Sequence, residues 1–198
     1  MNSKLLTSLG LALALCMGQV SQHAMAQTTG SISKHKSPST FTTEEIIASG
    51  HQFFGKTTRG LSEAVEYVFQ NQGEPTAYIV GEEGAGAFVG GLRYGEGTIY
   101  YKDGITQKIY WQGPSVGFDF GGNGSRTLTL VYNSDSPRDL YNRFIGVEGS
   151  AYFVGGLGVN FQQNHNIMLA PIRTGVGARL GANVGYLKYS KSPTWNPF

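Results

Sequence analysis

From Thr76 onward the chain is a succession of short β-prone runs separated by glycine-containing turns, and this pattern limits the possible folds more than any other feature. The clearest turn is "KDG" at 102–104, because Asp-Gly supplies the positive φ values that a tight hairpin needs. A second hairpin is expected at "GGNGS", residues 121–125. The pattern predicts a mainly β fold, a small soluble antiparallel β-barrel of about ten strands that are mostly joined as hairpins.

Glycine is also unusually abundant. Of the 29 glycines only Gly10 and Gly18 precede residue 27, which leaves 29 − 2 = 27 for the rest of the chain, about twice the usual share. There is no G-X-Y period, so collagen is excluded. The pentapeptide "FVGGL" occurs twice, and we expect each Gly-Gly pair to mark a point where a barrel strand bends or reverses. These glycines are Gly90, Gly91, Gly155 and Gly156.

One or two helices are predicted before the strands, packed on the barrel. Thr42 and Glu45 have the spacing of a capping box, which predicts a short helix that ends near Gly50 or Gly55. A second helix within 59–73 has one apolar stripe and is expected to lie across a sheet or to plug one end of the barrel. The stripe consists of Leu61, Ala64, Val65, Val68 and Phe69.

A third, short helix is expected inside the β-rich region. Ser136 can cap it, Pro137 fits its first position, and Asp139 suits the positive end of a helix. Just before it, the side chains of "RTLTLVYN" alternate between a face of leucine and tyrosine and a face of threonine and valine, which predicts a β-strand.

The N-terminus has the pattern of an export signal. Lys4 precedes an apolar run at 5–20, and the small residues of "AMA" at 24–26 predict cleavage after Ala26. An uncleaved anchor and a lipoprotein cleaved at Cys16 are the alternatives. The latter is disfavoured because Leu15 stands where a small residue is required. The expected layout is a signal peptide at 1–26, a disordered leader at 27–40, a domain at 41–190 and a tail at 191–198.

Cleavage would leave a chain without cysteine and with a net charge near +1, from 14 basic and 13 acidic residues once Lys4 is removed. This balance provides no broad basic field for nucleic acid. We therefore predict a periplasmic protein with no nucleic-acid partner and no membrane span after cleavage. A membrane β-barrel is a further alternative, disfavoured because Pro193 and Pro197 cannot serve within a final strand.

Catalytic and metal-binding patterns fail one by one. "GPSVG" around Ser115 has the letters of a nucleophile elbow but no strand–turn–helix context. No glycine set completes a dinucleotide motif, and the histidines are too scattered for a metal site. Glu82 and Glu83 are interpreted as a solvated turn before the glycines. We therefore predict no catalytic residue, cofactor or metal.

Two kinds of residue are candidates for contact with a ligand or partner. Asp119 and Arg179 stand within β-prone runs, where they would be surface charges or a buried polar pair. Tyr110, Trp111 and Tyr152 are aromatic side chains expected to be exposed.

Three stretches resemble a known family: "GLSEAVEYVFQNQGEPTAYIVGEEGAGAFVGGLRYGEG", "IYWQGPSVGFDFGGNGSR" and "LVYN". They are similar to the family of exported alphaproteobacterial proteins represented by envelope integrity protein A, from about Phe41 to the C-terminus. The resemblance implies a soluble periplasmic β-barrel of about ten strands with a helix, and a contribution to envelope integrity. It brings no enzymatic activity and no catalytic residues.

A more distant likeness is to the lipid-binding SYLF domain, whose apolar "L-V-x-N" run corresponds to Leu130, Val131, Tyr132 and Asn133. The leading hypothesis is thus a non-enzymatic protein that contacts an envelope component, whether lipid, polysaccharide or protein, and supports stress resistance. The alternative is a carrier of lipid or another apolar ligand.

A third hypothesis, an enzyme acting on envelope polymer, would need carboxylates that converge in a cleft. No pair can be placed together from the sequence among Glu82, Glu83, Glu96, Asp119 and Glu148.

Overall fold

The computed structural model describes residues 39–55, 60–86, 92–114, 125–174, 185–194 and 196. The predicted export segment, its cleavage site and nearly all of the leader lie outside these residues. Within them, no helix combines the length and the apolar character needed to cross a membrane.

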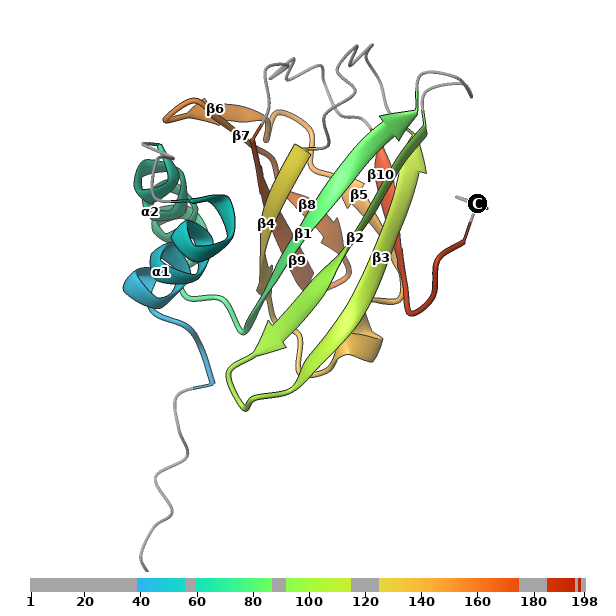
Figure 1. The fold of residues 1–198 in the computed structure, drawn as a ribbon, viewed down its shortest axis with the longest axis horizontal. Coiled ribbons are helices and arrows are strands. Elements are labelled where there is room, and N and C mark those ends of the chain that lie inside the picture. The colour runs from blue at the N-terminus through green and yellow to red at the C-terminus, as the bar shows by residue number, and fades with distance from the viewer. Residues whose placement is uncertain are drawn as a thin grey trace, which may run out of the picture. The chain divides into compact units, whose positions relative to one another are not determined.

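The described chain begins with two helices and continues as ten strands interrupted by one short 3₁₀ helix (Figure 1). The helices are α1 (Thr43–Phe54), α2 (Leu61–Gln72) and η1 (Pro137–Leu140). The strands are β1 (Ala77–Gly86), β2 (Leu92–Tyr101), β3 (Thr106–Pro114), β4 (Ser125–Tyr132), β5 (Arg143–Gly146), β6 (Tyr152–Val154), β7 (Leu157–Val159), β8 (Gln162–Asn164), β9 (Ile167–Arg173) and β10 (Tyr186–Ser190).

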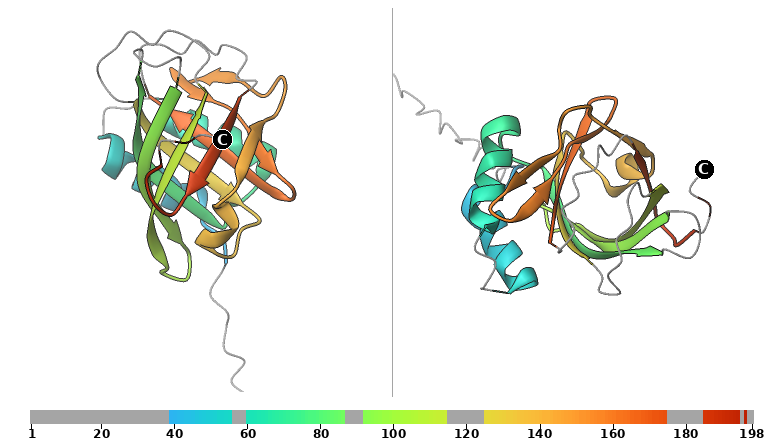
Figure 2. Two further views of the ribbon diagram at one scale, coloured as in Figure 1. Left: turned by 90° about the vertical axis from the view of Figure 1, so that its right-hand side faces the viewer. Right: turned by 90° about the horizontal axis from the view of Figure 1, so that it is seen from above.

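Eight of the strands form a closed antiparallel ring in the order β4-β1-β2-β3-β10-β5-β8-β9, and β9 pairs back with β4. The remaining two extend the sheet outside the ring, since β7 pairs with the upper part of β9 and β6 pairs with β7. Viewed from above, the strands close into a ring, whose interior we call the lumen (Figure 2). The predicted β-barrel is therefore confirmed.

The alternation of side chains in the ring produces two separate apolar clusters. The inner core fills the lumen and consists of Ala77, Ile79, Ile99, Tyr101, Ile109, Trp111, Val131, Leu140, Phe144, Ile167, Leu169, Leu187 and Tyr189. The outer core lies between the helices and the barrel wall and includes Ile46, Leu61, Val65, Val68, Leu128, Leu130, Tyr132, Ala170 and Ile172. Strand β4 contributes to both, because its successive side chains point to opposite faces.

The helices lie against the outside of the barrel (Figures 1 and 2). Helix α1 has the predicted capping box, in which the Thr42 hydroxyl accepts from the Glu45 backbone and the Glu45 carboxylate accepts from the Thr42 backbone. Helix α2 buries Leu61, Ala64 and Val65 against the wall. An apolar stripe on a helix needs only one covering surface, and the outward face of β4 and β9 provides it. The alternative that the helix plugs the barrel is therefore wrong.

Helix η1 lies at the lower end of the barrel (Figure 1). Ser136 caps this helix and Asp139 completes its capping box, as the sequence indicates. Leu140 is fully buried in the inner core. Nearby, the hydroxyl groups of Tyr101 and Ser134 hydrogen-bond at 2.6 Å.

Two hairpins show how the glycine turns work. The β2–β3 hairpin turns at the predicted "KDG", where Gly104 has a φ of 90°. At the second "FVGGL", Gly155 and Gly156 connect β6 to β7 with φ values of 58° and 84°, which a tight two-residue turn requires. The first copy, with Gly90 and Gly91, lies outside the described residues, as does most of the "GGNGS" hairpin.

Candidate functional site at the barrel mouth

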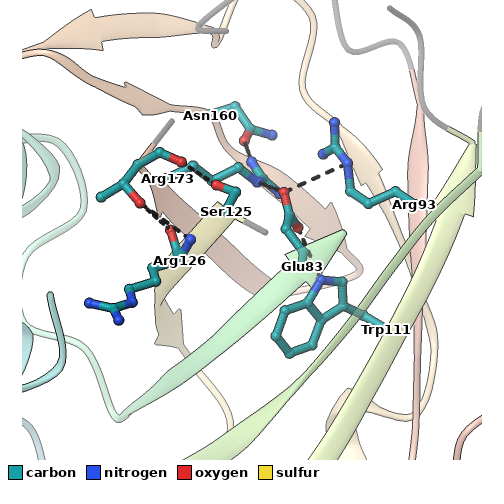
Figure 3. Close-up of polar contacts among 8 residues, drawn as sticks. Glu83, Arg93, Trp111, Ser125, Arg126, Asn160 and Arg173 are labelled. Atoms are coloured by element: carbon teal, nitrogen blue, oxygen red, sulfur yellow. Dashed lines mark hydrogen bonds and ion pairs between the residues drawn. The ribbon is translucent and has the colours of Figure 1, made fainter. Parts of the chain in front are cut away.

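The upper end of the barrel, where β1 ends and β2 begins, carries a group of polar and charged side chains inside the lumen (Figure 3). We call this end the barrel mouth. Its central residue is Glu83 of β1, whose side chain is only 6% exposed. Among the described residues it is the single buried acidic side chain.

Glu83 contacts side chains from three other strands. Arg173 Nε of β9 donates to Glu83 Oε1 at 2.7 Å, and Trp111 Nε1 of β3 donates to Glu83 Oε2 at 3.1 Å. Arg93 Nε of β2 lies 3.7 Å from Glu83 Oε1 and forms an ion pair with it. Arg173 also donates to the side-chain oxygen of Asn160, which lies between β7 and β8.

The position of Glu83 follows from the strand period. Ala77 and Ile79 point into the lumen, so Gly81 and Glu83 do as well, and Glu82 points outward. Outside the barrel, Glu82 forms a partly exposed ion pair with Arg126, 3.6 Å between Oε1 and Nε. The interpretation of Glu82 and Glu83 as a solvated turn is therefore wrong, because both residues lie within β1 and their environments are opposite.

The surroundings of Glu83 keep it ionised. Burial alone would raise the pKa of this carboxyl group. The positive charges of Arg173 and Arg93, and the hydrogen bonds from Trp111 and Arg173, outweigh that effect and hold the pKa below its ordinary value of 4.5. At neutral pH the carboxylate is a fixed negative charge that links β1 to three other strands.

Trp111 is buried, with 2% of its surface exposed, so the expectation of an exposed aromatic is wrong. Its indole occupies space left by glycines on the neighbouring strands. A Cβ atom at Gly95 would lie 2.1 Å from the indole ring, and one at Gly81 would lie 2.7 Å from it. The absence of side chains at Gly95 and Gly81 thus makes room for the large ring that donates to Glu83.

Two more inward polar groups lie near the mouth without a hydrogen-bond partner. Gln162 of β8 is 5% exposed, and its Oε1 has none. Thr127 of β4 is 2% exposed, is paired with Arg173 in the sheet, and its hydroxyl has none. Buried polar atoms usually find a partner, so unpaired atoms beside a charged cluster mark this end of the lumen as a candidate binding site.

The other candidate residues are not brought together there. Tyr110 lies on the outer face of β3 and is partly buried, whereas Tyr152 of β6 is 40% exposed on the hairpin outside the ring. Asp119, Arg179 and Ser115 lie outside the described residues. Glu96 and Glu148 are exposed, and Glu96 is paired in the sheet with the outward-facing Glu82. In the described part of the chain, no group of three or more His, Cys, Asp or Glu residues could hold a metal.

Comparison with known proteins agrees with this architecture. The family model of envelope integrity protein A matches residues 39–198, which is most of the chain. The chain belongs to the envelope integrity protein A family. The predicted family resemblance is thus confirmed.

A solved relative supports the same barrel. The crystal structure of an uncharacterized β-barrel-like protein from Brucella abortus is 59% identical to this chain, with a TM-score of 0.74. The match covers 81% of this chain and 99% of the Brucella protein. A search of curated proteins found no match.

Proposed function

We propose that this member of the envelope integrity protein A family is a non-enzymatic periplasmic protein that maintains the cell envelope under stress by binding another envelope component. The observation that carries the proposal is the family match over residues 39–198, together with the closed barrel that the same residues form. The export pattern at residues 1–26 fits a periplasmic location.

The chemistry of the mouth favours binding over catalysis. A general acid or base works best when its pKa lies near the operating pH. Glu83 is displaced in the opposite direction, because Arg173 and Arg93 hold its pKa below the ordinary value. Its two oxygens already accept from Arg173 and Trp111. Such a carboxylate positions its neighbours and does not transfer protons at neutral pH.

The cellular part of the proposal is tested with a deletion strain of the source bacterium grown on detergent or bile salt. We expect survival to fall and to return when the full chain is supplied. A chain without residues 2–26 serves as the matched control, because it would be made but not exported. Normal survival of the deletion strain, or rescue by the unexported chain, would contradict the proposal.

A second candidate function, binding to a lipid surface, is favoured by the β6–β7 hairpin. Its residues Tyr152 and Phe153 are 40% and 58% exposed, next to a tight turn outside the ring. Tyr152 is supported from behind by Tyr67 of α2, with ring centroids 5.1 Å apart. Aromatic side chains at a protruding turn suit the interface between water and lipid.

This alternative is tested by sedimentation of the purified protein with vesicles of phosphatidylethanolamine and phosphatidylglycerol. We expect Phe153→Ser to reduce the bound fraction. Ile105→Ser is the matched control, because Ile105 is 45% exposed at the end of the β2–β3 turn. Equal loss in both variants, or no sedimentation of the wild-type protein, would remove lipid binding from consideration.

A further inference from the structure

We propose that the barrel mouth contains a subsite for a neutral hydroxyl group, in which one hydroxyl of a small polyol or sugar donates to Gln162 Oε1. The subsite lies inside the ring, whereas the β6–β7 hairpin lies outside it. The inference goes beyond the proposed cellular role and does not require it, so a deletion phenotype and this binding can fail separately.

The strand period places the Gln162 side chain inside the barrel. Gln162 of β8 is paired in the sheet with Leu169 of β9, and Leu169 belongs to the inner core. Side chains of directly paired residues lie on the same face of a sheet, so Gln162 also points inward. The residue is accordingly only 5% exposed. Its amide group is therefore largely removed from bulk water and depends on nearby groups for hydrogen bonds.

Two glycines leave space beside this amide. In the sheet, Gln162 is paired with Gly146 of β5, and the Gly146 backbone N–H donates to the carbonyl oxygen of Gly185, just before β10. Neither glycine has a side chain to fill this part of the lumen, and a cavity of about 10 Å³ lies here. It is lined by Arg93, Pro114, Gln162, Gly185, Tyr186 and Leu187. Since this volume holds roughly one water-sized group, a ligand would insert a single group and keep the rest of the molecule outside.

The oxygen of Gln162 selects the kind of group that enters the cavity. Among the described lining residues, Gln162 Oε1 is a buried oxygen without a hydrogen-bond partner. Buried polar atoms usually have a partner, and leaving one unpaired is costly. A hydroxyl has one hydrogen to donate and therefore matches this single acceptor. A protonated amine has three hydrogens and a charge, so its burial here would cost more.

The surroundings of the cavity favour a polar molecule around that hydroxyl. Arg93 lines the cavity and forms an ion pair with Glu83, so the charged cluster of the mouth lies next to it. The part of a ligand that stays outside the cavity would meet these polar groups, and further hydroxyls suit them better than an alkyl chain. Small polyols and sugars have this composition.

The proposal is tested by NMR titration of the purified ¹⁵N-labelled protein. The backbone amides of Gly185 and Tyr186 and the side-chain amide of Gln162 report on the cavity, because these residues line it. The probes are glycerol, glucose, methanol and methylammonium. We expect glycerol and glucose to shift these signals in a saturable way and at lower concentration than methanol, which presents a hydroxyl alone. Methylammonium replaces that hydroxyl with a charged amine and should leave the signals unchanged.

A first variant removes the acceptor. Gln162→Met keeps a long unbranched side chain but has no amide oxygen, and it is expected to weaken glycerol binding about fivefold, the loss of one neutral hydrogen bond. Because that oxygen is unpaired in the ligand-free protein, the same change should raise the midpoint of thermal unfolding by about 2 °C. Gln163→Met is the matched control, since Gln163 is the next residue of β8 and is exposed. It should leave binding unchanged.

A second variant fills the cavity and keeps every polar side chain. A Cβ atom at Gly185 would lie 3.6 Å from the carbonyl oxygen of Pro114, which is an ordinary contact, so Gly185→Ala fits the fold. Because both residues line the cavity, the added methyl group takes the place of the ligand hydroxyl, and glycerol should no longer shift the signals. Gly84→Ala is the matched control, because a Cβ atom there would meet no described residue within 4 Å.

A response to glycerol alone assigns the subsite to linear polyols, and a response to glucose alone assigns it to sugars. Either result supports the proposal. It is overturned if no hydroxylated probe shifts the signals, if methylammonium acts as strongly as methanol, or if folded Gln162→Met or Gly185→Ala binds glycerol as the wild type does. Equal losses in the two control variants would also overturn it. So would a long-lived water at Gln162, detected by nuclear Overhauser effects, that glycerol does not displace.

Discussion

The outer core and the barrel mouth use the same strands for opposite purposes. On the outward face of β4, Leu128 and Leu130 are fully buried among the apolar side chains of α1 and α2. On the inward face of the same strand, the unpaired hydroxyl of Thr127 lies next in the sheet to Arg173. One face buries apolar surface, which stabilises the fold, and the other buries charge, which is costly unless each group is paired.

The two faces of the wall therefore differ in role: the outer core stabilises the fold, and the mouth is the candidate for binding. On the outside of the barrel, the helices cover β4 and β9 with apolar side chains. The lower lumen is equally apolar and includes Leu140. Within the described residues, the mouth holds the buried ion pairs of Glu83 with Arg93 and Arg173, so its polar residues are the ones to test for binding.

The largest effect is expected for Glu83→Gln. The change leaves Arg173 buried without its counter-charge, and the free energy of unfolding should fall by about 4 kcal/mol. Urea unfolding measures it. Glu82→Gln is the matched control, because the neighbouring carboxylate is exposed and its pair with Arg126 contributes less than about 1 kcal/mol. Adding Arg173→Met to Glu83→Gln should restore part of the loss. Equal effects at Glu82 and Glu83 would contradict the account of the mouth.

A somewhat smaller loss is expected for Leu130→Ala in the outer core. Removing this fully buried side chain deletes contacts between β4 and the helices and leaves a cavity, at a cost of about 3 kcal/mol. Urea unfolding gives the value. A loss no larger than that of an exposed substitution would contradict the role of Leu130 in the outer core.

A dependence on pH should accompany the Glu83 ion pairs. Since the pKa of Glu83 is lower in the folded protein than its ordinary value of 4.5, its stabilising contribution is complete above pH 4.5 and declines as the pH falls through the lower folded pKa. The stability difference between wild type and Glu83→Gln should therefore shrink below pH 4.5. A series of thermal unfolding curves at decreasing pH measures it. A difference that stays constant down to the acid transition would refute the electrostatic explanation.

The smallest effect is expected for Thr127→Val, and its sign is opposite. The Thr127 hydroxyl is buried without a partner, and replacing it by a methyl group of similar shape should stabilise the ligand-free protein by about 1 kcal/mol. Thr129→Val, at the next inward position of β4, is the comparison. If Thr127→Val destabilised the protein, its hydroxyl would have a partner that the mouth supplies.

The parts of the fold that follow from local chemistry were predictable. Three features depend on residues that are close together in sequence: the Thr42–Glu45 capping box, the apolar stripe of α2, and the Asp-Gly turn that contains Gly104. Strand β5 was not expected, because "RFIG" is too short to show a period and directly follows a helical pattern. The run "LGVNFQQ" contains two strands, β7 and the first part of β8, because the chain passes from the extension outside the ring into the ring between them.

For the mouth, the inward position of Glu83 could be predicted from the sequence, but its pairing with Arg173 could not. The alternation of Ala77, Ile79 and Gly81 continues to Glu83, so a strand that extends to residue 83 places this carboxylate inward. Its partner Arg173 is 90 residues away, and no local pattern joins the two. That pairing depends on ring closure through β4 and β9, which is a property of the whole topology.

The place of β10 in the ring has a consequence for how the protein is made. This strand is the last of the described strands, yet it lies between β3 and β5. Synthesis runs from the N-terminus, so β3 and β5 expose unpaired edges until residues 186–190 emerge. Exposed edges invite pairing with other chains. The ring therefore closes only after β10 has taken its place, and a truncation that removes β10 leaves the edges of β3 and β5 open to pairing with other chains.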